Sequence, residues 1–425
     1  MSSHQYICQA TFRGGICYRP RMNLVALQSP SFRAYLFSVA VALHGFWAKR
    51  VIIGWLAWEL TGSAAFVGFV SFLNLAPTFL CGPFFGVIAD RIDVRRASIV
   101  NYASVCLITF GFVALTTTSW LTAWAVAGFS LATGLISSLN HPVRMSLTPR
   151  LAPAAHMSSV IALTATNFNV SRLLGPVMGG ALIQAVGATA ALFVAALCYV
   201  PVVITLNFVT ARDRATSTEA VPTGFIAALV GGIRYALDHH LIRLGIILSG
   251  FVAIAGRSVL ETLPVLADGV FNAGPTGLGL MTAGAGVGAL AASLAKVLGR
   301  GQLEGTVPPI VLVMALVTPG LVSGLSVIDQ FWQALILTVM LGFSITIVAV
   351  SLQSMIQMEL PDHYRGRVMG LWTMVSIGGG AVGAMLMGTI GDLFGISMAQ
   401  ICIGGGMFVL CFYTATTLRK AGRSR

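Results

Sequence analysis

The sequence has few charged residues. Only 9% of its 425 residues are Asp, Glu, Lys or Arg, whereas a soluble domain has about 25%. So few charges cannot coat a water-facing surface, which excludes an ordinary soluble protein. The hydrophobic residues, 56% of the chain, must therefore face lipid. Apolar runs long enough to cross about 30 Å of hydrocarbon recur along the whole length.

Motifs that bind nucleotides or catalyse hydrolysis are missing. The phosphate-binding pattern GxxxxGK[ST] cannot occur, because the lysines are at positions 49, 296 and 420 and none follows a glycine. No HExxH or Ser/His/Asp pattern supports a membrane enzyme. The seven cysteines form no CxxC pair and no metal-ligand cluster, so we expect neither structural disulfides nor a bound metal. We expect no enzyme activity and no cofactor.

The basic excess does not indicate a nucleic-acid partner. The formal net charge is +12, but no basic helix, zinc-ligand pattern or aromatic-plus-basic strand is present to read DNA or RNA. The first 31 residues carry Arg13, Arg19 and Arg21 without an apolar core or a small-residue cleavage site. We therefore expect a cytoplasmic tail rather than a signal peptide.

Hydropathy predicts an all-α integral membrane protein with twelve spans in two six-helix bundles. The bundles cover residues 32–210 and 241–418, a central loop at 211–240 joins them, and tails at 1–31 and 419–425 flank them. A semi-apolar helix is expected near Gly224–Leu237. The predicted spans are Tyr35–Leu60, Ala64–Ala89, Ala97–Thr117, Leu121–Ser138, Ser158–Ala185, Ala188–Val209, Leu241–Leu263, Gly277–Leu298, Pro309–Val327, Trp332–Met355, Val368–Ile390 and Ile396–Leu418.

The positions of the basic residues predict the orientation. If both termini are cytoplasmic and the spans alternate, 21 of the 25 Lys and Arg residues lie inside, four lie within spans and none lies in an outside loop. Cytoplasmic loops carry such an excess of basic residues. An odd number of spans would scatter these residues over both faces. The pattern therefore indicates an even number of spans with both termini inside.

The two halves resemble each other. Gly68 and Ser71 match Gly279 and Thr282 at an offset of 211, and Gly175, Gly179 and Gly187 match Gly379, Gly383 and Gly391 at an offset of 204. These matches pair the second span of each half, and the fifth span of each half, in the same direction. A parallel repeat of six helices predicts a substrate cavity between the halves near the membrane midplane.

Two short motifs carry a family resemblance. The segment from Gly86 to Arg96, GVIADRIDVRR, joins the second and third spans and resembles the GxxxDRxGRR signature of the major facilitator superfamily, with Asp93 and Val94 in place of the usual Gly and Arg. The segment GPVMGG in the fifth span resembles the GPxxGG element of antiporters in that superfamily. Small residues at this spacing permit close helix contact, so ordinary packing is the alternative interpretation. The gating residues that these motifs suggest are Gly86, Asp90, Arg91, Arg95, Gly175, Pro176, Gly179 and Gly180, with Arg365 and Arg367 in the second-half loop.

Longer blocks narrow the resemblance to one branch. WLAWELTGSA, ALTATNFNVSRLLGPVMGG, TLPVLAD and GLGLMTAGAGVGALAA together resemble the enterobactin-exporter-like branch of the superfamily across nearly the whole chain. The resemblance implies the major facilitator fold, the bacterial inner membrane, and proton-linked export of siderophores, drugs or related metabolites. One departure concerns the fourth span. Leu121–Ser138 contains no ionisable residue, so the Arg that many antiporters carry there has no counterpart.

Four cations lie within the predicted spans, at Lys49, Arg50, Arg172 and Arg257. Each costs about 2.5–3.5 kcal/mol at a helix centre, so such residues normally face a water-filled cavity or a partner. Successive residues of a helix point about 100° apart, so Lys49 and Arg50 cannot both face the cavity. Either could instead reach a membrane interface, and Arg172 could clamp helices together. The candidate substrate-binding residues are Lys49, Arg50, Phe46, Trp47, Arg172, Arg257 and Trp372, which would favour an anionic or catecholate-like substrate.

Glu261 is the best candidate for proton coupling. It lies four residues after Arg257, on the same helix face, so we expect the two side chains to pair. His44 is a second candidate, although a single His among apolar residues is more often simply hydrogen-bonded.

The favoured function is a monomeric exporter that exchanges a small-molecule substrate for protons across the lipid bilayer. Three alternatives remain open: an uptake permease for a siderophore or metabolite, a lipid flippase, and a membrane scaffold that transports nothing. The charges inside the spans and the lack of a sizeable soluble domain argue against the scaffold.

Overall fold

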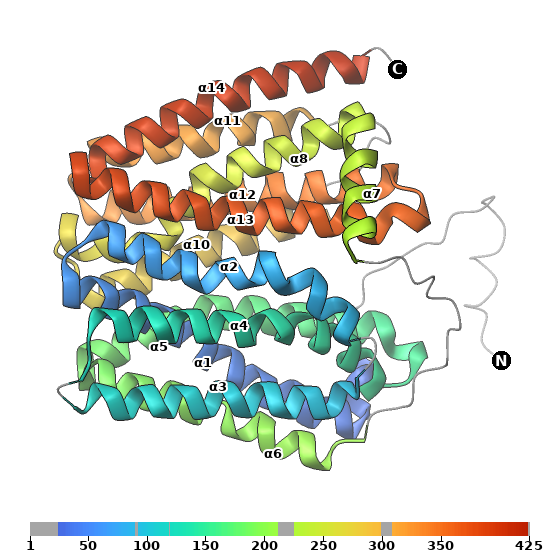
Figure 1. Cartoon of the computed structure of the whole chain (residues 1–425), viewed down its shortest axis with the longest axis vertical. Helices are drawn as coiled ribbons and strands as arrows, with labels where there is room; N and C mark the ends of the chain where they lie inside the picture. The colour runs from blue at the N-terminus through green and yellow to red at the C-terminus, as the bar shows by residue number, and fades with distance from the viewer. Residues whose placement is uncertain (1–23, 90–91, 119, 211–224, 299–307, 424–425) are drawn as a thin grey trace, which may run out of the picture.

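The computed structural model describes residues 24–89, 92–118, 120–210, 225–298 and 308–423, and no strand occurs among them (Figure 1). The α-helices are α1 (Pro30–Thr61), α2 (Ala64–Ala89), α3 (Val94–Thr116), α4 (Ala123–Leu147), α5 (Met157–Leu197), α6 (Val200–Phe208), α7 (Phe225–Asp238), α8 (His240–Val252), α9 (Ser258–Glu261), α10 (Gly274–Leu298), α11 (Pro309–Gly324), α12 (Phe331–Glu359), α13 (Asp362–Phe394) and α14 (Ile396–Arg423). Short 3₁₀ turns cover Leu24–Gln28, Thr148–Leu151, Ala154–His156 and Leu325–Val327, and π-helical turns cover Ala253–Arg257 and Val265–Val270.

The predicted membrane fold is confirmed. Eleven stretches of the described chain are long and apolar enough to cross a bilayer, and one of them, Ala154–Phe208, has 55 residues. A straight helix of that length would measure about 82 Å, far more than the roughly 30 Å of hydrocarbon. The backbone reverses within it at Gly187, whose φ of 81° suits glycine because other residues meet a Cβ clash there. This stretch therefore supplies two crossings, and the twelve predicted spans are accounted for.

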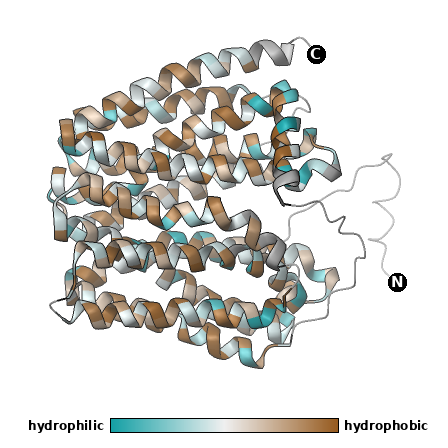
Figure 2. Cartoon of the chain, in the orientation of Figure 1, coloured by the Kyte–Doolittle hydropathy of each residue, from teal (hydrophilic) through white to brown (hydrophobic). Residues whose placement is uncertain are grey.

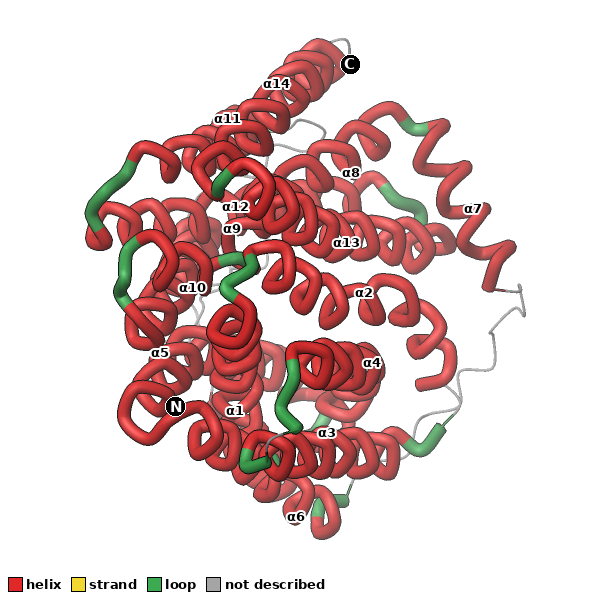
Figure 3. The backbone as a smooth tube through the Cα atoms, turned by 60° about the vertical axis from the view of Figure 1, so that its left-hand side comes forward, coloured by secondary structure: helices red, strands yellow, loops and turns green. Residues whose placement is uncertain are grey.

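The helices form two halves, the N-half (residues 24–210) and the C-half (residues 225–423). Both α1 and α14 have their chain-terminal residues at one end of the bundle, called the termini end, and the opposite end is called the far end (Figure 1). Two helix pairs join the halves, α2 with α13 and α5 with α10; α2 and α13 lie side by side in two views (Figure 1, Figure 3). The amphipathic helix α7 crosses the termini end at a steep angle to the spans.

The repeat seen in the sequence governs these contacts. A Cβ on Gly68 of α2 would lie 3.0 Å from the carbonyl carbon of Ala384 on α13, and a Cβ on Gly279 of α10 would lie 3.3 Å from the Cα of Gly180 on α5. Gly68 and Gly279 are the pair related by the offset of 211, and residues 180 and 384 are related by the offset of 204. Equivalent glycines therefore make equivalent close contacts between the halves.

Large apolar side chains cover much of the surface of the described chain. Leu107 is 70% exposed and Tyr413 is 73% exposed, and hydrophobic residues run along the lengths of the helices (Figure 2). Hydrophilic residues gather around α7 and the helix ends beside it. Contiguous exposed apolar surface of this extent marks contact with lipid.

The buried core is shared at one end of the molecule and divided at the other. One cluster runs from Val51 and Ile52 of α1 through Leu263 and Leu278 of the C-half, so it joins both halves at the far end. A second cluster lies wholly within the N-half, and a third lies wholly within the C-half, both towards the termini end. The halves are therefore packed together at the far end and separately packed at the termini end.

Two differences from the predicted spans concern the fourth and the seventh. The fourth was expected to end at Ser138, but α4 continues to Leu147 and includes Arg144 in its last turn. Asn140 and Pro142 lower the hydropathy there and made the span look finished. The absence of an ionisable residue therefore holds for Leu121–Ser138 but not for the whole of α4. The seventh span is not one regular helix, because a π-helical turn at Ala253–Arg257 separates α8 from α9.

Candidate functional site

A cavity lies between the two halves, where the shared core gives way to the two separate ones. It encloses about 740 Å³, including space open to solvent. Its walls combine apolar side chains with a few charges, hydroxyl groups and one amide. The lining residues are Phe46, Trp47, Lys49, Arg50, Val51, Ile53, Gly54, Val70, Ser71, Asn74, Ser130, Thr133, Ser137, Leu260, Glu261, Leu263, Pro264, Leu278 and Thr282.

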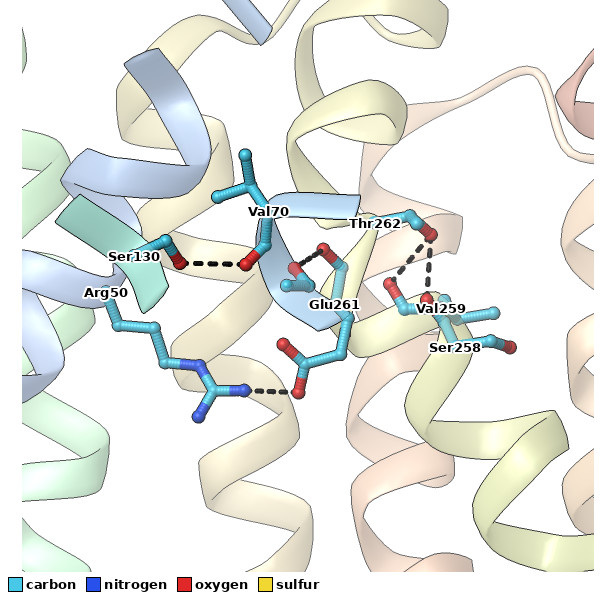
Figure 4. Close-up of polar contacts among 8 residues, drawn as sticks. Arg50, Val70, Ser130, Ser258, Val259, Glu261 and Thr262 are labelled. Atoms are coloured by element: carbon cyan, nitrogen blue, oxygen red, sulfur yellow. Dashed lines mark hydrogen bonds and ion pairs between the residues drawn. The ribbon is translucent and has the colours of Figure 1, made fainter. Parts of the chain in front are cut away.

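The halves meet in this cavity through an ion pair between Arg50 of α1 and Glu261 of α9 (Figure 4). The Glu261 side chain is 7% exposed and the Arg50 side chain is 29% exposed, so the pair lies at the border between protein and open space. The Oγ of Ser71 also donates to the backbone carbonyl of Glu261, at 3.2 Å. Both the carboxylate and the backbone carbonyl of Glu261 are therefore bound by the opposite half of the molecule.

The expected Arg257–Glu261 pair is wrong. Among the described residues, Arg257 forms no ion pair; its side chain packs on α13, where a Cβ on Gly380 would lie 2.9 Å from its Nε. A signal for the actual pair was present in the sequence. Arg50 and Glu261 are 211 residues apart, which is the repeat offset, so they occupy equivalent positions on the first span of each half.

Two further arginines add positive charge near this pair. Arg172 and Arg257 do not line the cavity, but both interact electrostatically with Arg50. The Trp47 ring lies near two guanidinium groups, with the Cζ of Arg50 5.8 Å and the Cζ of Arg172 6.0 Å from its centroid. Three guanidinium groups and one carboxylate therefore interact here, so this cluster has two more positive than negative charges among the described residues.

Lys49 and Arg50 do point in different directions. Lys49 is 3% exposed, and its Nζ has no hydrogen-bond partner among the described residues. That Nζ lies 5.2 Å from the ring centroid of Tyr199 and 5.9 Å from that of Phe129. Lys49 therefore forms part of the cavity wall with its amine turned into an aromatic pocket. Phe46 lines the cavity and packs edge-on against Trp47 at 5.5 Å.

Two of the predicted site residues lie elsewhere. The Nδ1 of His44 is 2.7 Å from the carbonyl oxygen of Ala40 and 3.2 Å from the Oγ of Ser171, so His44 joins α1 to α5. The Nε1 of Trp372 donates to the Oγ of Ser249 at 3.1 Å, within the C-half. Neither belongs to the cavity lining, and their proposed roles stay predictions.

The GPxxGG element serves two interfaces at once. Gly175 and Gly179 face α1, where a Cβ on each would lie 3.0 Å from the carbonyl oxygen of His44 and 2.9 Å from that of Ala48. Pro176 and Gly180 face α10 of the opposite half, where the carbonyl oxygen of Pro176 lies 2.8 Å from a Cβ built on Gly279. The element therefore places α5 between a partner of its own half and a partner of the other half.

The remaining gating candidates lie at the termini end. Arg95 donates to the last carbonyls of α6, from its Nε to Leu206 at 2.8 Å and from a terminal nitrogen to Asn207 at 2.5 Å. Arg367 packs against α7, with its Cβ 3.1 Å from a Cβ built on Gly232, and Arg365 is exposed. The backbone of Gly86 belongs to α2, while its surroundings, Asp90 and Arg91 lie outside the described part of the chain.

Polar residues that the sequence did not assign complete the cavity. The Nδ2 of Asn74 donates to the carbonyl oxygen of Ser130 and to the Oγ1 of Thr133, both at 3.3 Å. The sequence did not indicate that Ser130 and Thr133 line a cavity, because small hydroxyl residues are common wherever helices pack together. In the described residues, no group of three His, Cys, Asp or Glu could hold a metal ion.

Comparisons with known proteins agree on a transport family. The family model described as transmembrane secretion effector, within the major facilitator superfamily, matches residues 22–422. The enterobactin exporter EntS of Salmonella typhimurium is 25% identical over 410 residues, which cover 95% of this chain and 96% of that protein. The staphyloferrin A transporter of Staphylococcus aureus is 22% identical over 394 residues, which cover 87% of this chain and 94% of that protein.

Solved structures agree on the fold. The nucleoside transporter NupG superposes with a TM-score of 0.70 at 11% identity, covering 91% of this chain and 98% of that one. A bacterial homologue of the human lysosomal transporter Spinster, in an inward-facing and unoccupied conformation, gives 0.69 at 12% identity, covering 92% and 98%.

Proposed function

We propose, on the premise that this chain belongs to the transmembrane secretion effector family of the major facilitator superfamily, that it exports a small anionic solute in exchange for protons. Membership of this family makes the chain a multi-pass membrane transporter and not an enzyme. The nature of the solute, the direction of its movement and the role of protons are the proposal.

The charge balance of the cavity supports an anionic solute. Arg50 forms an ion pair with Glu261, whereas Arg172 and Arg257 form no ion pair among the described residues. Uncompensated cations at hydrocarbon depth are expensive, so a negatively charged ligand that reaches them is favoured. Guanidinium groups also bind carboxylate and phenolate oxygens through several N–H donors. The three arginines around a single carboxylate are the observation that carries this proposal.

Glu261 supplies the site at which a proton and the solute can compete. A carboxylate offers about four acceptor positions, and the Glu261 side chain uses one of them for Arg50 among the described residues. A hydroxyl or amine of the solute would donate a hydrogen bond to another of these acceptor positions. Protonation of Glu261 removes part of its acceptor capacity, which weakens its hold on that hydroxyl or amine of the solute. A proton arriving from outside would then release the solute there.

The proposed orientation follows the distribution of basic residues. The 21 Lys and Arg residues other than Lys49, Arg50, Arg172 and Arg257 belong to one side of the predicted topology, which we assign to the cytoplasm. The termini end would then be cytoplasmic, and the separately packed ends of the two halves would admit solute from the cytoplasm. We propose that the protein works in this way as a monomer in the inner membrane of a bacterium.

A flux assay in inverted membrane vesicles tests the proposal. Inverted vesicles that contain the protein and have an acidic interior would be incubated with enterobactin, staphyloferrin A, a cationic dye or a lysophospholipid. We expect accumulation of an anionic compound that stops when the proton gradient is dissipated. Accumulation of the dye alone would contradict the anion preference, and movement only in right-side-out vesicles would indicate uptake.

Two other outcomes distinguish the remaining alternatives. Movement of the lysophospholipid alone would indicate a lipid flippase. Absence of flux under every gradient, with a folded protein in the vesicles, would favour a scaffold. Arg257→Gln serves as the matched variant, because a neutral residue there should reduce transport of the anion while leaving the Arg50–Glu261 pair in place.

A further inference from the structure

The hydrogen bonds between the halves have a common polarity. Five of them join residues that the structure describes, and in each the donor belongs to the N-half and the acceptor to the C-half. Three acceptors are carboxylates. Besides Glu261 with Arg50, Asp268 accepts from the Nε1 of Trp58 at 2.9 Å, and Asp392 accepts from Ser63 and Ala64.

Asp392 caps a helix that belongs to the other half. It follows Gly391 near the C-terminal end of α13, and its Oδ1 accepts from the backbone N–H of Ala64, the first residue of α2, at 2.6 Å. Its Oδ2 accepts from the Oγ of Ser63, which in turn accepts from the N–H of Phe66 at 3.0 Å. The first N–H groups of a helix have no partner within it, and the helix dipole attracts negative charge there.

The backbones of α13 and α2 touch beside this cap. A Cβ on Gly388 would lie 2.9 Å from the carbonyl carbon of Ala64 and 3.0 Å from the Cα of Ala65. The glycine lets the two helices approach closely enough for Asp392 to reach the N-terminus of α2. The cap and this contact both lie at the far end, where the halves share one core.

We propose that Asp392 is a positioning residue for alternating access. Its carboxylate stabilises the conformation that is closed at the far end, because it satisfies donors of α2 only while the halves are together. Opening the far end separates Asp392 from α2 and leaves both groups to water. Loss of the charge shifts the population towards the far-open conformation. This role is independent of the solute and of the direction of transport.

Thiol labelling from the two sides of the membrane tests this role. The full-length protein, with its native cysteines replaced, carries Ser137→Cys in the cavity lining and is placed in right-side-out and inside-out vesicles. A membrane-impermeant maleimide then measures access from each side. We expect Asp392→Asn to lower the labelling rate from the termini end and raise it from the far end. The ratio of the two rates should change about tenfold, which corresponds to about 1.4 kcal/mol.

The matched control is Asp329→Asn. Asp329 is an exposed acid between α11 and α12, in a far-end loop, with no cross-half contact among the described residues. The Asp329→Asn substitution removes one negative charge from the same end of the protein and should leave the ratio of the two labelling rates unchanged. Ser63→Ala should shift the ratio in the same direction as Asp392→Asn. The double variant should change the ratio by a factor smaller than the product of the two single-variant factors.

Two results would overturn the proposal. A ratio in Asp392→Asn equal to that of the parent would show that the cap does not bias the conformation. Labelling that rises from both sides would show a general loosening of the bundle, which is a structural effect and not a positioning role. Because no solute takes part, either result leaves the proposed export function untouched.

Discussion

Replacement of Glu261 by Gln removes one charge from the contact between the halves while keeping its shape. A net hydrogen bond to a charged group contributes about 1.5–3 kcal/mol, and removing one partner of a fully buried ion pair costs about 3–5 kcal/mol. Here the Glu261 side chain is 7% exposed but the Arg50 side chain is 29% exposed. Because Arg50 is partly exposed, we expect the smaller of these two effects, a loss of about 2 kcal/mol in the free energy of unfolding.

A double-mutant cycle isolates the pair. Arg50→Gln, Glu261→Gln and the double variant would be unfolded in mixed micelles by titration with sodium dodecyl sulfate. We expect a coupling energy of about 1.5–2 kcal/mol, since residues in direct contact are not additive. The control cycle uses Arg96 and Asp93, whose side chains are 87% and 55% exposed at 3.4 Å, and should give at most about 0.5 kcal/mol. A coupling between Arg50 and Glu261 as small as the control would refute the reasoning.

Two further predictions concern stability and use the same titration. Lys49→Met should leave the free energy of unfolding unchanged or higher, because the Lys49 amine is buried without a hydrogen-bond partner among the described residues and an apolar chain of similar length fills the space. Lys49→Ala should lower the free energy of unfolding by roughly 1–3 kcal/mol through the cavity it leaves. A large loss in Lys49→Met would contradict this account. Arg95→Gln should lower the free energy of unfolding by about 1–2 kcal/mol, because the carbonyls of Leu206 and Asn207 lose their donors. Arg96→Gln, next to it and exposed, should change it by less than about 0.5 kcal/mol, so equal effects of the two would count against the helix-end role of Arg95.

Much of the fold could be predicted, because the bilayer restricts what the sequence can do. Apolar runs must span as helices, so hydropathy located the spans, and the predicted fifth and sixth spans meet beside Gly187, where the backbone reverses. The end of α4 could not be predicted from hydropathy. Asn140 and Pro142 resemble the start of a loop, while the structure continues the helix to Leu147 and includes Arg144.

The site was predictable in composition but not in pairing. The costly charges at Arg50 and Glu261 indicated a cavity, and both residues line it. Their pairing was missed because helix periodicity relates only neighbours in sequence, whereas this contact joins residues 211 apart. The far-end role of Asp392 had no local signal, since an acid at the end of a helix resembles an ordinary loop residue. Contacts between the halves depend on how the bundles meet, which the pattern within one helix does not specify.

The central claim is that a proton and the solute compete for Glu261 in the cavity between the halves. Its most direct test is the pH change when a solute is added to the purified protein in weakly buffered solution, with enterobactin and staphyloferrin A as the probes. The account predicts that binding releases protons from the wild-type protein and that Glu261→Gln binds without any release. Proton uptake on binding would contradict it, because the solute would then displace Glu261 from Arg50 and travel together with the proton.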